Sequence, residues 1–128
     1  MKGLVFGFII AGSLLLIAAK PVPSGTFALV EPGPYHLGDT VHFSWSADLK
    51  PSQNPRIQVV CFKGSQVVYG EAQDAQGNAF VLGGGWSDWR DVGGPADCIA
   101  TLYFWDFHPT QTFNPLAPPI GFHAEGAN

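Results

Sequence analysis

The stretch Thr40-Val41-His42-Phe43-Ser44-Trp45-Ser46-Ala47 decides the fold of this chain. Its odd-numbered positions carry apolar side chains and its even-numbered positions carry polar ones. Because successive side chains of a β-strand point to opposite faces of a sheet, this alternation predicts a half-buried strand. No segment after residue 19 has a convincing helical period, so the chain is predicted to be all-β.

The same period of two recurs around the two cysteines. Residues 56–62 and 97–105 each place a cysteine, Cys61 or Cys98, on the face that carries the aliphatic side chains. Lys63-Gly64-Ser65 predicts a hairpin turn that leads into a further strand. The remaining strands are expected over residues 26–30, 66–70, 78–82 and 120–123. Short strands separated by Gly- and Pro-rich turns predict an antiparallel β-sandwich of the immunoglobulin-like kind.

The first 19 residues have the composition of an export signal rather than of a folded core. Lys2 is their only charged side chain, and residues 3–19 are mostly apolar and end in small residues. This layout predicts a secretory signal peptide or, if it is not cleaved, a hydrophobic helix that anchors the chain in the membrane. The positive charges at the start predict that the amino end stays in the cytoplasm and the domain lies outside. A buried core helix is the alternative, which the lack of a polar face disfavours.

Length and charge limit the remaining possibilities. A chain of 128 residues allows one domain. We divide the chain after residue 19 into a linker at 20–25, the sandwich at 26–108 and a Pro-rich C-terminal tail at 109–128. The tail is expected to be a strap on the sandwich or a flexible end, with its strand near 120–123. Six Lys and Arg against ten Asp and Glu give a net charge of −4, which disfavours nucleic acid and anionic membrane surfaces as partners.

The two cysteines are an even pair in a chain expected to reach an oxidising compartment, so a disulfide between Cys61 and Cys98 is predicted. The alternative is two unrelated buried thiols. The chain has four scattered histidines, His36, His42, His108 and His123. Because their spacing is not that of a metal site, we expect surface imidazoles and no metal or cofactor. No nucleophile elbow, phosphate loop or zinc-protease motif occurs, and the chain is predicted not to be an enzyme.

Four segments carry a resemblance to a known group of domains: Gly38–Phe43, Ile57–Cys61, Val67–Gly70 and Gly93–Tyr103. In this order they resemble the small, mostly uncharacterised immunoglobulin-like β-sandwich domains that bacteria and their phages export. The resemblance covers about residues 26–106. It implies a sandwich with a bridge between its two cysteines and transfers no catalytic residue. Because Cys61 lies on the strand after that of Trp45, the bridge is expected between neighbouring strands of one sheet or between two adjacent edges.

The loop Trp86-Ser87-Asp88-Trp89-Arg90-Asp91 is the predicted binding loop. Glycines bound it on both sides, and loops at the ends of a sandwich carry recognition residues. Trp and Arg dominate binding hot spots, and the face of a Trp ring stacks on sugar rings and cations. The alternative is that Trp86 and Trp89 fold back to cover one open end of the sandwich.

A second candidate surface is an apolar stripe on the outward face of the two strands that carry the cysteines. Val60 and Phe62 on one strand share it with Tyr103 and Trp105 on the other if the two strands pair. An apolar strip of this kind marks an interface unless something covers it. The sequence leaves two covers open: the segment Phe113-Asn114-Pro115-Leu116, or a second subunit of a homo-oligomer.

These expectations combine into an exported, non-enzymatic binding or adhesion module, either secreted or anchored at the outer side of the plasma membrane. Its partner is expected to be a protein or a glycan reached through the predicted binding loop. The alternative is a structural or accessory assembly protein of a phage particle or of the cell envelope, joined through the apolar stripe. Contact with a membrane is expected only through residues 3–19, if they are retained.

Overall fold

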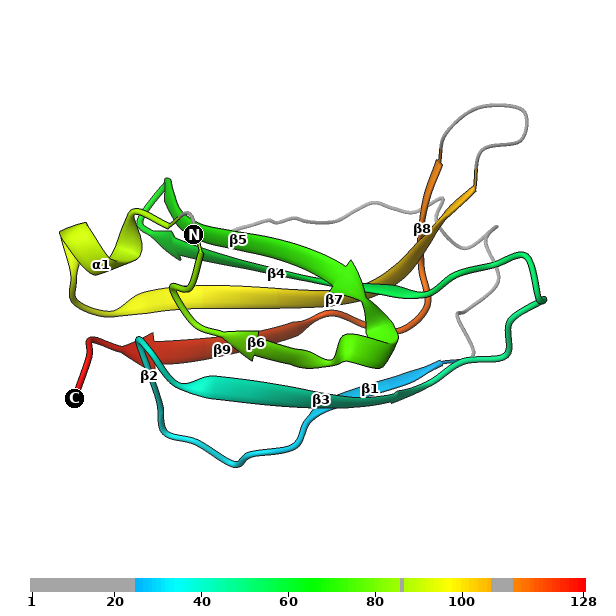
Figure 1. Cartoon of the computed structure of the whole chain (residues 1–128), viewed down its shortest axis with the longest axis horizontal. Helices are drawn as coiled ribbons and strands as arrows, with labels where there is room; N and C mark the ends of the chain where they lie inside the picture. The colour runs from blue at the N-terminus through cyan, green and yellow to red at the C-terminus, as the bar shows by residue number, and fades with distance from the viewer. Residues whose placement is uncertain (1–24, 86, 107–111) are drawn as a thin grey trace, which may run out of the picture.

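The computed structural model describes residues 25–85, 87–106 and 112–128, which form a β-sandwich of two sheets (Figure 1). The smaller sheet has the order β1-β3-β6, and the larger sheet has the order β2-β9-β7-β4-β5, with β8 paired to β7. The strands of the smaller sheet are β1 (Thr26–Leu29), β3 (Thr40–Ser46) and β6 (Ala79–Val81). Those of the larger sheet are β2 (Tyr35–His36), β4 (Arg56–Lys63), β5 (Gln66–Asp74), β7 (Ala96–Asp106), β8 (Thr112–Pro115) and β9 (Ile120–Glu125). The all-β prediction is therefore confirmed.

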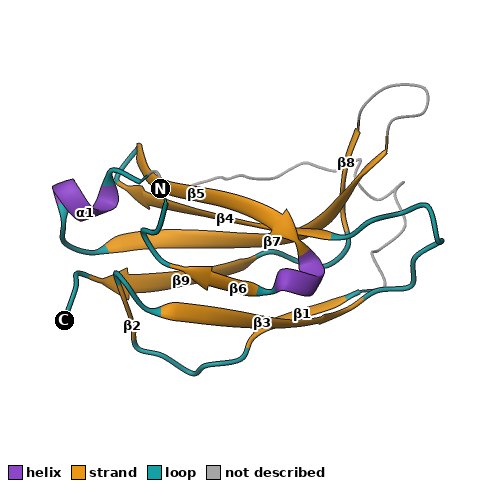
Figure 2. Ribbon diagram, in the orientation of Figure 1, coloured by secondary structure: helices purple, strands orange, loops and turns teal. Residues whose placement is uncertain are grey.

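Two short helical turns join strands: η3 at Ala75–Gly77 and α1 at Trp89–Val92 (Figure 2). No helix in the described part of the chain is long and apolar enough to cross a bilayer. The predicted export segment at 1–19 and most of the linker lie outside the described residues.

The predicted alternation along β3 sets the packing of the smaller sheet. Val41 and Phe43 are buried, whereas the polar residues that alternate with the apolar ones along β3 are exposed or half-buried. The Phe43 ring stacks on Phe27 of β1, with 5.0 Å between centroids, and meets Phe80 of β6 edge-on at 5.6 Å. Aromatic pairs in these geometries add to the hydrophobic gain of burial, so the three strands are joined by side chains as well as by hydrogen bonds.

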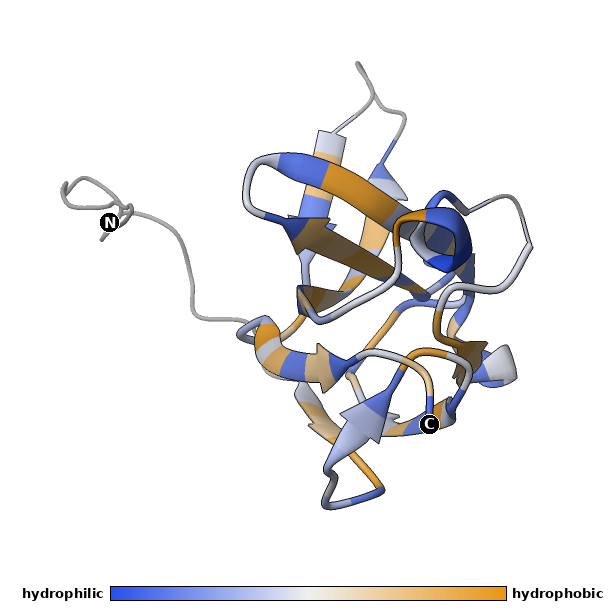
Figure 3. Ribbon diagram, turned by 90° about the vertical axis from the view of Figure 1, so that its left-hand side faces the viewer, coloured by the Kyte–Doolittle hydropathy of each residue, from blue (hydrophilic) through white to orange (hydrophobic). Residues whose placement is uncertain are grey.

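The inward face of the larger sheet follows the same rule. Ile57, Val59 and Cys61 of β4 are fully buried, and Figure 3 shows hydrophobic residues on strands of both sheets. Both sheets contribute to one core, whose largest fully buried side chains are Trp89, Tyr69, Phe43, Phe80, Ile57, Leu82, Leu102, Val41, Val59 and Val68. The predicted hairpin between β4 and β5 is present at Lys63-Gly64-Ser65.

The end of the chain is more integrated than a tail on the sandwich. The strand expected near 120–123 is β9, which lies inside the larger sheet, antiparallel to β7 and parallel to β2. Ala124 of β9 is fully buried, and Phe122 packs against the core and meets Tyr35 of β2 edge-on. Burial of these side chains stabilises the strand in the sheet. The short parallel pairing of β2 with β9 also departs from the predicted purely antiparallel arrangement.

Candidate functional site

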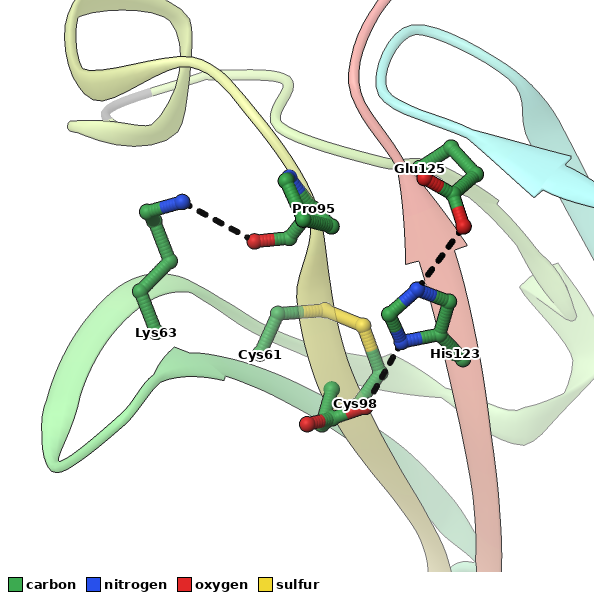
Figure 4. Close-up of polar contacts among 7 residues, drawn as sticks. Cys61, Lys63, Pro95, Cys98, His123 and Glu125 are labelled. Atoms are coloured by element: carbon green, nitrogen blue, oxygen red, sulfur yellow. Dashed lines mark hydrogen bonds and ion pairs between the residues drawn. A yellow bond between two sulfur atoms is a disulfide. The ribbon is translucent and has the colours of Figure 1, made fainter.

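The disulfide links neighbouring strands of one sheet. Cys61 of β4 and Cys98 of β7 are direct cross-strand partners with 4.0 Å between their Cα atoms, and both side chains are buried (Figure 4). The predicted pairing is confirmed, and of the two expected placements the bridge takes the one within a sheet. No cysteine remains free in the chain.

The structure corrects the expectation for Trp89 in the predicted binding loop. Trp89 is the first residue of α1 and is fully buried. Its indole N–H donates to the Gly94 carbonyl at 2.9 Å, and its ring packs near Tyr69 with 6.4 Å between centroids. The hydroxyl of Ser87 donates to the Val68 carbonyl at 2.7 Å and so ties the loop to β5. Trp89 therefore covers one end of the core, which was the alternative interpretation of the loop.

The other loop residues divide between surface and undescribed positions. Asp88, Arg90 and Asp91 are exposed, and the Nε of Arg90 donates to the Gly83 carbonyl at 3.1 Å. Trp86 lies outside the described residues. The loop thus offers charged side chains to solvent, while Trp89, one of the two tryptophans of the predicted binding loop, belongs to the core.

The apolar stripe on the outward face of the larger sheet is present around Val60. Val60 of β4 pairs with Ile99 of β7, so the two strands do share the stripe. Ile99 is 46% exposed, and Val67, the cross-strand partner of Phe62 on β5, is 51% exposed. We call Val60, Phe62, Val67 and Ile99 the central apolar patch.

Farther along β7 the stripe is partly covered. The ring of Phe113 on β8 stacks on Tyr103 with 4.6 Å between centroids, and Tyr103 is only 3% exposed. The segment that contains Phe113 therefore covers this end of the stripe, as one of the two expectations proposed. Trp105 meets both rings edge-on but stays 37% exposed. Of the candidate interface face, Tyr103 is therefore shielded from solvent by Phe113 and is not exposed for contact with a partner.

A groove of about 830 Å³ lies beside this aromatic cluster. It is formed where the chain before β4, the ends of β4 and β5, and the far part of β7 converge. Its polar lining comes from Ser52, Asn54, Arg56, Asp74 and Gln76. Its aromatic lining comes from Tyr103 and Trp105. We call this hollow the Trp105 groove; Figure 1 shows β8 and the far end of β7 at the end of the molecule opposite α1.

Strand register places the charged pair of the groove. Arg56 is the cross-strand partner of both Asp74 on β5 and Tyr103 on β7, so the three side chains form one row across the sheet. The Nη1 of Arg56 donates to Oδ1 of Asp74 at 3.0 Å. A β-bulge at Val68 produces this pairing: the register counted from the hairpin turn would set Arg56 opposite Gln73, and the extra residue moves Asp74 into place.

Histidines lie beside carboxylates, which the sequence did not predict. His123 of β9 contacts Asp97 through Nδ1 at 2.8 Å and Glu125 through Nε2 at 3.0 Å (Figure 4). The hydrogen bond to Asp97, followed by that to Glu125, raises the pKa of His123. Similarly, the backbone N–H of His42 donates to Glu31 and lowers the pKa of that carboxyl. No group of three metal-ligating side chains with the geometry of a metal site occurs among the described residues.

The groove residues Arg56 and Asp74 were not among the predicted site residues. They are 18 positions apart, and only the bulged hairpin register brings them together. The opposite charges of Arg56 and Asp74, near the two ends of the predicted hairpin, were a sequence signal for this pair. The one-residue register shift of the bulge hides it, because an unshifted hairpin would not place the two residues opposite each other.

Comparison with protein-family models, with curated proteins and with solved structures gives no significant match for this chain.

Proposed function

We propose that the chain is an exported, non-enzymatic binding module with an immunoglobulin-like sandwich. The strand order supports the fold assignment: β1-β3-β6 corresponds to strands A-B-E, and β9-β7-β4-β5 corresponds to strands G-F-C-C′ of the variable type. The disulfide differs from the antibody pattern, because it links the C and F equivalents within one sheet.

Two observations support a location outside the reducing cytosol. Disulfides persist in oxidising compartments, and the Cys61–Cys98 bridge is buried between two central strands. The sequence of residues 1–19 has the layout of a signal peptide or signal anchor. In this proposal the chain is secreted, or held at the outer side of the plasma membrane through residues 3–19.

The Trp105 groove is the single observation that carries the binding function. Ligand sites are concave and hold a few convergent polar groups, and their volumes are roughly 300–1,000 Å³. The groove has a volume of about 830 Å³ and brings an exposed indole next to an ion pair. It also lies where loops meet strand ends, a usual place for recognition on a sandwich.

Retention on cell surfaces tests this proposal. The full chain, produced with its disulfide formed, is incubated with washed envelope fragments of a panel of bacteria. We expect retention that Trp105→Ala removes and that Ile99→Ala, a change outside the groove on the same sheet face, leaves intact. Equal retention of both variants, or no retention on any envelope, would refute the groove as the binding site.

The central apolar patch favours a second candidate function, a structural or accessory assembly protein of an envelope or phage particle. Val67 and Ile99 expose about half of their surfaces on the outward face of the sheet. Gly70 and Gly121 are the cross-strand partners of Val60 and Ile99, and they leave the row flat on both sides. A flat apolar sheet face suits packing against a second sheet. Native mass spectrometry of the wild type and of Ile99→Lys distinguishes the two: assembly requires an oligomer that the substitution dissociates, whereas a monomer in both excludes self-assembly.

A further inference from the structure

We propose that the Trp105 groove binds a neutral saccharide chain. This inference rests on the proposed binding function and names the chemical class of its ligand. Three features of the groove carry it: a free aromatic face, polar groups that both donate and accept, and balanced charge.

Trp105 differs from the other described tryptophans. The indole N–H of Trp45 donates to the Ala75 carbonyl, and that of Trp89 donates to Gly94. Within the described part of the chain Trp105 has no such internal acceptor, and it keeps 37% of its surface exposed in the wall of a groove. Its position is also fixed, because Tyr103 and Phe113 pack edge-on against it at 5.8 and 5.6 Å. A held, half-exposed ring next to polar groups offers a surface on which the C–H face of a sugar ring can stack.

The polar lining matches the hydroxyl groups of a sugar. Each hydroxyl both donates and accepts, so the complementary site needs both kinds of partner. Only Nη1 of Arg56 is used by Asp74, which leaves further guanidinium donors, and the Asp74 side chain is 78% exposed with a second carboxylate oxygen. The amides of Asn54 and Gln76 supply one acceptor and two donor hydrogens each on the two sides of this pair.

The charge of the groove argues against ionic ligands. Among the described residues that line the groove, Arg56 and Asp74 carry the charged side chains, and they neutralise each other at 3.0 Å. A phosphate or sulfate group would meet the Asp74 carboxylate, and a cationic group would meet the Arg56 guanidinium. The groove is open to solvent, so a bound ligand can keep one side hydrated. A neutral oligosaccharide satisfies these conditions.

The test uses defined sugars as probes. Binding of cellohexaose, chitohexaose, maltohexaose and a mannan oligosaccharide to the full chain is measured by calorimetry and by indole fluorescence. We expect at least one to bind, Trp105→Ala to weaken it at least about tenfold, and Arg56→Gln to weaken it several-fold. Val81→Ala, at an exposed position on β6 of the smaller sheet, is the control. Because the ligand is neutral, the affinity should change less than about twofold between 50 and 500 mM salt.

The outcomes separate this inference from the proposed function. If envelope retention depends on Trp105 but none of the sugars binds, and protease treatment of the envelope removes the retention, the ligand is a protein: the binding function stands and the saccharide is refuted. Binding that strengthens for sulfated or phosphorylated sugars and fails in high salt refutes the neutral ligand. Sugar binding that Trp105→Ala leaves unchanged refutes the site. Circular dichroism and thermal unfolding of each variant show that a loss of binding is not a loss of folding.

Discussion

Truncation of Trp89 tests whether the predicted binding loop is structural. The side chain has no exposed surface, contacts Tyr69 and donates its indole N–H to Gly94. Replacing a buried Trp by Ala costs about 3–5 kcal/mol, through lost burial and the cavity left behind. Domains of this size have a free energy of unfolding of about 5–15 kcal/mol, so Trp89→Ala removes a large share of the stability.

A graded series makes the test sharper. Trp89→Phe keeps an aromatic ring but deletes the indole N–H, which leaves the Gly94 carbonyl without its donor and reduces the packed volume. We expect this variant to lose about 1–3 kcal/mol, between the wild type and Trp89→Ala. Trp105→Ala is the matched control: its ring is partly exposed, so it loses less buried area than Trp89, together with two edge-on contacts, to Tyr103 and Phe113, of about 0.5–1.5 kcal/mol each.

Urea unfolding followed by far-ultraviolet circular dichroism measures all three variants, because this signal does not depend on which indole is removed. Trp89→Ala is expected to be the most destabilising of the three variants. If Trp89→Ala unfolded at nearly the wild-type urea concentration while envelope retention disappeared, Trp89 would be a contact residue and its burial would have no structural role. The same outcome would return the binding site to the loop at 86–91.

Three further predictions follow from the disulfide, one histidine and one glycine. The Cys61–Cys98 bridge closes a loop across a sequence separation of 37 residues. The double variant Cys61→Ala/Cys98→Ala should therefore lower the free energy of unfolding by about 4 kcal/mol, on the chain-entropy estimate. Urea unfolding measures this loss, and a value below about 1 kcal/mol would contradict the estimate. Because the pKa of His123 is raised, its ion pairs stabilise the fold fully below about pH 6.5, and this stabilisation is lost as the pH rises through the raised pKa. In an NMR titration, Asp97→Asn should lower the pKa of His123 again. An unchanged pKa in this variant would exclude the contact with Asp97. Gly83 has φ +78°, and an added Cβ would clash with Cδ1 of the buried Leu37. Gly83→Ala should therefore lower the melting temperature, whereas Gly70→Ala, which has open space around it, should not. Similar melting temperatures for the two variants would oppose this explanation.

The strands could be predicted from sequence because their burial follows a period of two. The alternation along residues 40–47 and 56–62 fixed which side chains face the core, and the structure buries Val41, Phe43 and Cys61 accordingly. The strand β2 was missed because two residues carry no periodic signal, and β8 was missed because it lies in the Pro-rich segment that was interpreted as a strap or a flexible end. Their pairing is instead determined by tertiary contacts, such as Tyr35 against Phe122 and Phe113 against Tyr103.

The site was harder to predict because burial, and not residue type, separates the tryptophans. Trp89 and Trp105 both lie near glycines or prolines in aromatic-rich segments, and both residues are typical of hot spots. Which one is exposed depends on how far the chain folds back over the core, and this is a property of the whole fold. The groove partners Arg56 and Asp74 depend in addition on the bulge at Val68, which composition cannot locate.

The unequal lengths of two strands explain why the exposed aromatic ring stands at this end of the molecule. Strand β7 has 11 residues and β4 has eight, and Tyr103 of β7 is already paired with Arg56, the first residue of β4. Beyond Tyr103, β7 pairs with β8 alone. Trp105 therefore lies past the end of β4, where no residue of β4 lies beside it. The Trp105 groove lies at this end of β4, and its lining includes Ser52, Asn54 and Pro55, which precede the strand, as well as Arg56, its first residue. At the opposite end α1 closes the sandwich with Trp89. The same strand overhang therefore produces both the hollow and the ring that faces it, and a change that lengthened β4 by extending its pairing to Trp105 should abolish the site without altering the core.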